Sequence, residues 1–214
     1  MEQSFLQILQ KEPYRVYFPA GILYLIIGLA VWLPHAYTEV AAYPIFFHRY
    51  LVLNGFLFSF VAGFLMTALP QFTKTTMASP FDLIGINALT LLGAVGIYQQ
   101  SFHGANLYTG LVSFFQALLI LLFLLQRFLK AKVNPPYTFP LIALGILVWM
   151  TFGLARFLYP QESFLLSEYE LQHEAAINIL LLGVGGRLFP GIMGHTDVIK
   201  RQKFFYETEK PLFK

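Results

Sequence analysis

Residues 45–69 read IFFHRYLVLNGFLFSFVAGFLMTAL, and His48 and Arg49 are the only basic residues in this stretch. A helix needs about 20 predominantly apolar residues to cross the hydrocarbon core of a bilayer. The stretch meets that length, and Pro44 and Pro70 mark its two ends. It therefore predicts a transmembrane helix that carries a histidine and an arginine in its first turn.

Five further apolar stretches predict five more spans, at residues 16–34, 82–100, 106–127, 138–159 and 172–193. Hydrophobic residues make up 57% of the chain and charged residues only 12%, which is far too apolar for an ordinary soluble domain. The composition shows no break and no linker. We therefore expect an all-α integral membrane bundle of about six transmembrane helices, forming a single domain over residues 1–214.

The basic residues of the chain gather in alternate connections between the predicted spans. One side holds Lys11, Arg15, Lys74, Arg127, Lys130, Lys132, Lys200, Arg201 and Lys203, whereas the other holds only Arg49 and Arg156. Cytoplasmic loops carry an excess of lysine and arginine, so this pattern predicts that both termini are cytoplasmic. The sequence pI of about 9.0 then reflects these loops and not a nucleic-acid partner.

Four of the five histidines fall at the outer ends of predicted spans, and imidazole is a common ligand of metals and of haem. They are His35, His48, His103 and His173, whereas His195 lies near the inner end of the sixth span. We place His103 in the outer loop between the third and fourth spans. A histidine in such a loop is usually solvated, which is the simpler interpretation of His35 and His103. His48 and His173 each begin a span, where ionisable residues are costly and tend to mark function.

Three arginines are candidate partners of a bound group. Arg49 and Arg156 would lie at the outer membrane boundary, where they can pair with haem propionates or extend to lipid headgroups. Arg187 lies deep in the sixth predicted span and requires a carboxylate, a propionate or several carbonyls. The chain has no cysteine, which excludes disulfides and thiolate ligands. Any metal must therefore be bound by other side chains.

Three parts of the chain resemble the NnrS family of membrane proteins. They are FHRYLVLNGF (47–56) with VAGFLMTALPQFT (61–73), then HEA (173–175) with Arg187 and GHT (194–196), and YRVYF (14–18). These matches occur in the same order as in the family. The family's second histidine and glutamate are replaced by Tyr50 and Leu51, and its closing glycine by Asp197.

The resemblance implies a bacterial inner-membrane protein that contains haem b and copper and takes part in nitric oxide metabolism and tolerance of nitrosative stress. Carried over by position, it implies that His48, His173 and His195 are metal ligands and that Arg187 matches a family arginine. Family members are typically longer, so the resemblance describes a shortened relative and leaves open whether one of the two metals is lost.

We therefore expect a b-type haem protein whose metal site lies near the outer face, with His48 and His173 as the first ligands to test. An exchangeable axial position on the iron binds nitric oxide or oxygen, whereas two protein ligands favour electron transfer with a redox partner protein. Whether the chain is an enzyme stays open. One alternative is an electron carrier with stacked haems, which needs paired histidines near both faces. The other is a non-catalytic subunit of a partner oxidase or reductase, which needs no cofactor.

Overall fold

The computed structural model describes residues 4–37, 44–98, 102–133, 138–160, 174–186 and 193–194. These residues form helices and short connections, with no strand among them. The elements are α1 (Phe5–Lys11), α2 (Tyr14–Ala30), α3 (Trp32–Tyr37), α4 (Ile45–Tyr50), the π-helix η1 (Leu51–Leu57), α5 (Phe58–Thr73), α6 (Pro80–Tyr98), α7 (Phe102–Leu129) and α8 (Phe139–Leu158). A shorter apolar helix, Glu174–Gly186, follows.

Five helical stretches of the described chain are long and apolar enough to cross a membrane. They are Tyr14–Tyr37, Ile45–Thr73, Pro80–Tyr98, Ala105–Leu129 and Phe139–Leu158. They coincide with the first five predicted spans, and the prediction of an all-α membrane bundle is confirmed. Of the sixth predicted span the structure describes the Glu174–Gly186 part.

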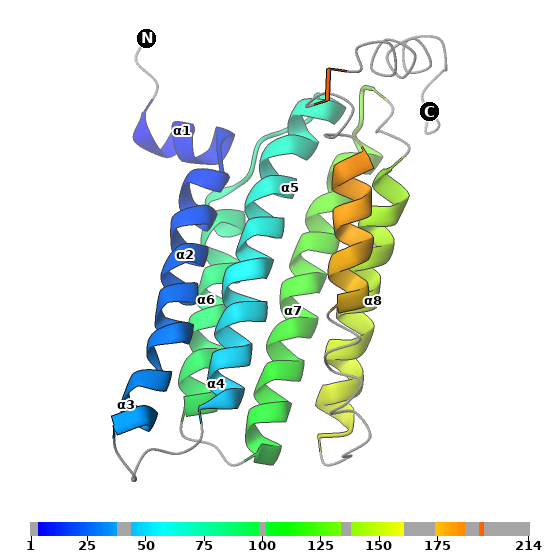
Figure 1. The fold of residues 1–214 in the computed structure, drawn as a ribbon. Helices are drawn as coiled ribbons and strands as arrows, with labels where there is room; N and C mark the ends of the chain where they lie inside the picture. Colours follow the sequence, from blue (N-terminus) through cyan, green and yellow to red (C-terminus); the bar gives the residue numbers. More distant parts are fainter. Residues whose placement is uncertain are drawn as a thin grey trace.

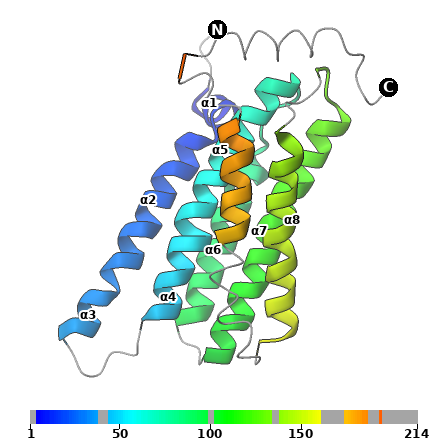
Figure 2. The ribbon, with the colours of Figure 1, turned by 45° about the vertical axis from the view of Figure 1, so that its right-hand side comes forward.

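The long helices stand side by side, and α1 lies across the end of α2 (Figure 1). α3 and α4 lie together at the opposite end of the bundle from α1 (Figures 1 and 2). α8 ends at this α3–α4 end as well, and α7 begins there. The loop position predicted for His103 is wrong, because α7 already begins at Phe102 and includes this histidine in its first turn.

The helix Glu174–Gly186 packs against the first half of α8 (Figure 2). A Cβ built on Gly145 of α8 would lie 2.7 Å from Leu180 Cγ and 3.1 Å from the carbonyl oxygen of Ala176. Gly145 lies 13 residues before the end of α8 at Leu158. At about 1.5 Å per residue, Gly145 is about 20 Å from the end of α8. The helix Glu174–Gly186, which packs against Gly145, therefore begins well short of the α3–α4 end.

Burial follows the pattern expected in a bilayer, with apolar side chains both inside the bundle and on its outer surface. The main core gathers around Phe58, Leu65, Ile120 and Trp149. A smaller core at the α3–α4 end contains Tyr24, Tyr50, Leu51, Ile97, Ala105 and Val112. Large side chains such as Leu92 and Val95 of α6 are exposed, which suits a surface that faces lipid.

Candidate functional site

His48 lies in α4 near the beginning of the second span and is half-buried. Its Nδ1 lies 2.8 Å from the main-chain carbonyl oxygen of Gly28 on α2. A carbonyl oxygen can only accept a hydrogen bond, so Nδ1 carries the proton and donates it. The lone pair of a neutral imidazole is then on Nε2. Histidines that bind metals are typically oriented in this way, by a hydrogen bond from the nitrogen that does not bind the metal.

Trp32 on α3 lies between the two histidines that are described at this end of the bundle. The centroid of its ring is 5.6 Å from that of His48 and 6.2 Å from that of His35, and both contacts are edge-on. The structure therefore brings His35 and His48 to the same end, as the sequence predicted. His35 is partly exposed.

The two arginines that were predicted to lie at the outer boundary are at the same end as His48. Arg49 follows His48 on α4 and is half-buried. Arg156 lies in the last turn of α8 and is only 8% exposed. Cationic side chains that are buried at the edge of a bundle need anionic or hydrogen-bonding partners. This end of the bundle therefore combines two histidines with two arginines.

The second span is interrupted by the π-helical turn η1, a few residues beyond His48. The N–H of Phe58 donates to the carbonyls of Leu53 and Gly55, five and three residues back. It passes over the carbonyl of Asn54, which an α-helix would pair with it. Single π-helical turns within α-helices are frequent at functional sites.

The carbonyl of Asn54 accepts a hydrogen bond from another helix. Nε2 of Gln116, on α7, lies 3.0 Å from this oxygen and 2.7 Å from Oγ1 of Thr90 on α6. Oε1 of Gln116 in turn accepts from Nδ2 of Asn54 at 3.0 Å. Asn54, Gln116 and Thr90 are completely buried. A polar core therefore joins the second, third and fourth spans in the interior of the bundle.

Two further side chains complete this polar core. Nδ2 of Asn54 also donates to Oγ of Ser113 at 2.7 Å, and the hydroxyl of Tyr50 donates to the carbonyl of Thr90 at 2.8 Å. Among these residues the sequence pointed only to Tyr50, which replaces the family's second histidine. Asn54 and Gln116 are polar residues inside apolar spans, which is the signal that would have identified them.

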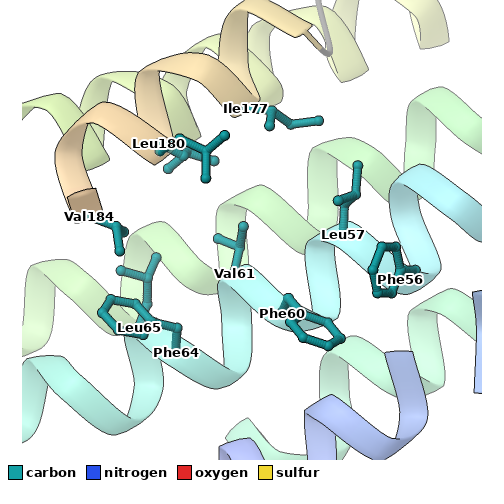
Figure 3. A pocket seen from close by; sticks show the side chains of 10 residues that line it. Phe56, Leu57, Phe60, Val61, Phe64, Leu65, Ile177, Leu180 and Val184 are labelled. Atoms are coloured by element: carbon teal, nitrogen blue, oxygen red, sulfur yellow. The ribbon is translucent and has the colours of Figure 1, made fainter. Parts of the chain in front are cut away.

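A separate apolar groove of about 270 Å³ lies between α5 and the helix Glu174–Gly186 (Figure 3). Side chains such as Val61 and Leu65 of α5 face Leu180 and Val184 across it. Every residue that lines the groove is aliphatic or phenylalanine, and His48 is not among them. The groove is therefore distinct from the site around His48.

Arg127 forms a structural contact at the opposite end of the bundle from α3 and α4. It is 5% exposed, and its Nη2 lies 3.0 Å from the carbonyl of Met77 and 3.5 Å from Oδ2 of Asp82. Its guanidinium carbon lies 3.6 Å from the centroid of the Phe123 ring. From its position in the sequence Arg127 is only one of several loop charges, whereas in the structure it links α6 and α7 at this end.

His173, Arg187 and His195 lie outside the described residues, as does the side chain of His103. The predicted pairing of His48 with His173 therefore stays a prediction. Within the described part of the chain, no group of three or more histidine, aspartate, glutamate or cysteine side chains could hold a metal ion. The described residues offer one oriented imidazole and not a complete ligand set.

The fold and this site define a multi-pass membrane protein with a polar interior and a histidine-bearing end. Residues 8–205 match the family model described as "NnrS protein", which covers most of the 214 residues. The chain therefore belongs to the NnrS family, and the resemblance found in the sequence is confirmed. No curated protein and no solved structure matches the chain.

Proposed function

We propose that this chain is a membrane haem protein of nitric oxide metabolism or nitrosative-stress tolerance, in which His48 would hold the haem iron. The observation that carries the proposal is the hydrogen bond from His48 Nδ1 to the carbonyl of Gly28. It fixes the ring and leaves Nε2 for an iron atom. Family membership supports the connection with nitric oxide.

The donor set decides which of the two implied groups the described residues fit. Haem needs only one or two axial ligands from the protein, so a single oriented imidazole is a sufficient start. Copper that is bound by imidazoles alone would need more histidines than the described part of the chain brings together. The described residues therefore fit haem, and copper would depend on His173 and His195.

The residues around His48 have distinct roles in this proposal. His48 binds and orients the group, and Trp32 restricts the movement of the imidazole ring by its edge-on contact. Arg49 and Arg156 would hold the propionates, and Arg187 is a further cation to test. A haem iron with an exchangeable position would supply the binding of a diatomic ligand such as nitric oxide.

The test is the visible spectrum and haem content of the purified protein and two matched variants, recorded before and after addition of nitric oxide. We expect His48→Ala to lose most of the haem. His35→Ala, at the same end and against the same tryptophan, should keep haem at the parental level. A His48→Ala variant with parental haem content and an unchanged spectrum would overturn the ligation. A parent protein without colour or metal would instead favour the non-catalytic subunit.

A further inference from the structure

The turn Leu51–Leu57 contains a backbone carbonyl, that of Asn54, which accepts a hydrogen bond from another helix. Because the N–H of Phe58 bonds to Leu53 and Gly55, the carbonyl of Asn54 lacks its α-helical donor. In hydrocarbon an unsatisfied carbonyl is costly, since no water replaces the missing donor. An N–H group that another part of the protein supplies to this carbonyl therefore stabilises the π-helical turn.

Gln116 supplies that group, and its other bonds hold it in place. Its Nε2 donates to the Asn54 carbonyl at 3.0 Å and to Thr90 Oγ1 at 2.7 Å. Its Oε1 accepts from Asn54 Nδ2, so the Gln116 amide bonds both the main chain and the side chain of Asn54. Both side chains are completely buried.

The π-helical turn also decides where His48 points. It contains one residue more than an α-helical turn would, so α4 is displaced relative to α5. Relaxation to an α-helix would rotate α4 by about 100° and move it by about 1.5 Å along the axis. Such a movement would separate His48 Nδ1 from the Gly28 carbonyl, to which it is bonded at 2.8 Å.

We propose that Gln116 is a positioning residue that keeps the turn Leu51–Leu57 π-helical and thereby directs His48 at Gly28. Thr90 holds the Gln116 amide, but it has no bond of its own to the turn among the described contacts. For any effect on a bound haem, the inference rests on the proposed function. For the position of α4, it rests on the geometry alone.

The absence of cysteine makes a direct test of this geometry straightforward. A Cβ built on Gly28 lies 3.2 Å from Cβ of Leu51, the first residue of the turn. Disulfides form at Cβ separations of about 3.5–4.5 Å, so Gly28→Cys with Leu51→Cys should cross-link in membranes after a small adjustment. The pair reports the same α2–α4 contact as the hydrogen bond of His48.

The cysteine pair is introduced into the parent protein, Gln116→Leu and Thr90→Val, and the cross-linking yield of the three under mild oxidation is compared. We expect Gln116→Leu to reduce the yield about tenfold, because a rotated α4 carries the two sulfurs out of bonding range. Thr90→Val, which removes one bond of Gln116 and leaves the turn its donor, should cross-link like the parent. A parental yield in Gln116→Leu, or a parent that does not cross-link, would overturn the inference.

Deletion of Leu53 keeps the test decisive if Gln116→Leu does not accumulate. Removal of one residue from the π-helical turn restores α-helical bonding without rotating either flank, so the Asn54 carbonyl no longer needs Gln116. The deletion combined with Gln116→Leu should therefore accumulate and cross-link, and its failure to do so would overturn the inference. Deletion of Val61 in α5 is the control, and it should not be tolerated.

Haem content of the same variants separates this inference from the proposed function. Loss of cross-linking together with loss of haem would support both. Loss of cross-linking with unchanged haem would keep the positioning role of Gln116 and remove His48 as a ligand. Parental cross-linking with reduced haem would leave the haem proposal standing and refute the positioning role.

Discussion

Gly110 and Gly153 let α7 and α8 approach until their backbones touch, and a methyl group at either position should part them. A Cβ on Gly110 would lie 2.6 Å from the amide nitrogen of Phe157 and 2.8 Å from the carbonyl oxygen of Gly153. A Cβ on Gly153 would lie 2.6 Å from the amide nitrogen of Phe114. The atoms in the way are backbone atoms, which cannot turn aside as a flexible side chain can.

The expected cost follows from these distances. Restoring ordinary contact requires the helices to separate by almost 1 Å, and overpacking of this kind costs about 1–3 kcal/mol. The substitution also stabilises the helix itself by about 0.5–1 kcal/mol, because alanine has a higher helix propensity than glycine. Gly110→Ala should therefore destabilise the bundle by about 1 kcal/mol, and by no more than about 2.5 kcal/mol. In Gly85→Ala, the nearest obstacle is a flexible Leu119 methyl at 3.4 Å, so this control should be neutral or slightly stabilising.

The assay is unfolding of the purified protein by titration with sodium dodecyl sulfate, followed by tryptophan fluorescence. Trp149 lies on α8 itself and is 2% exposed, so its emission should report separation of this helix. The double variant Gly110→Ala with Gly153→Ala should cost less than the sum of the two single variants, because one separation relieves both clashes. Equal stability of Gly110→Ala and Gly85→Ala would refute the reasoning.

Two further predictions concern the ends of the bundle. Arg127→Met should lower stability by about 1–3 kcal/mol in the same titration, because it removes the partner of a partly buried carboxylate and of the Met77 carbonyl. Arg15→Met, which breaks only the exposed pair with Glu12, should leave the transition unchanged, and equal effects would contradict the linking role of Arg127. A reporter fused after Lys214 should be cytoplasmic and one inserted near His103 should lie across the membrane, because the basic residues favour that orientation. A reporter after Lys214 that lies outside the cytoplasm would refute the predicted topology.

The spans could be predicted from the sequence because length and hydropathy are sufficient to define them. The second span shows where this reasoning stops. Leu51–Leu57 contains no proline, and its π-helical form depends on Gln116, which lies 62 residues away from Asn54 along the chain. A local pattern cannot predict a backbone conformation that a distant side chain stabilises.

The candidate site could likewise be predicted only in part. His48 could be singled out because an ionisable side chain at the beginning of a span is costly unless it is used. Its acceptor could not be predicted, because the carbonyl of Gly28 is a main-chain group that every residue has, so the residue type gives no signal. The contact of Trp32 with His48 likewise depends on how α3 meets α4, which hydropathy does not describe.

The polar core has a consequence for the order in which the protein is made. Asn54, Thr90 and Gln116 lie on three successive spans, and Asn54 and Thr90 enter the bilayer before Gln116, their common partner, has been synthesised. Until Gln116 is inserted, the Asn54 carbonyl has no donor from α7. We therefore expect a continuous α-helix to be the more stable form of the newly inserted second span. The π-helical turn, and with it the final direction of His48, is therefore a late product of biogenesis that forms only when the fourth span arrives.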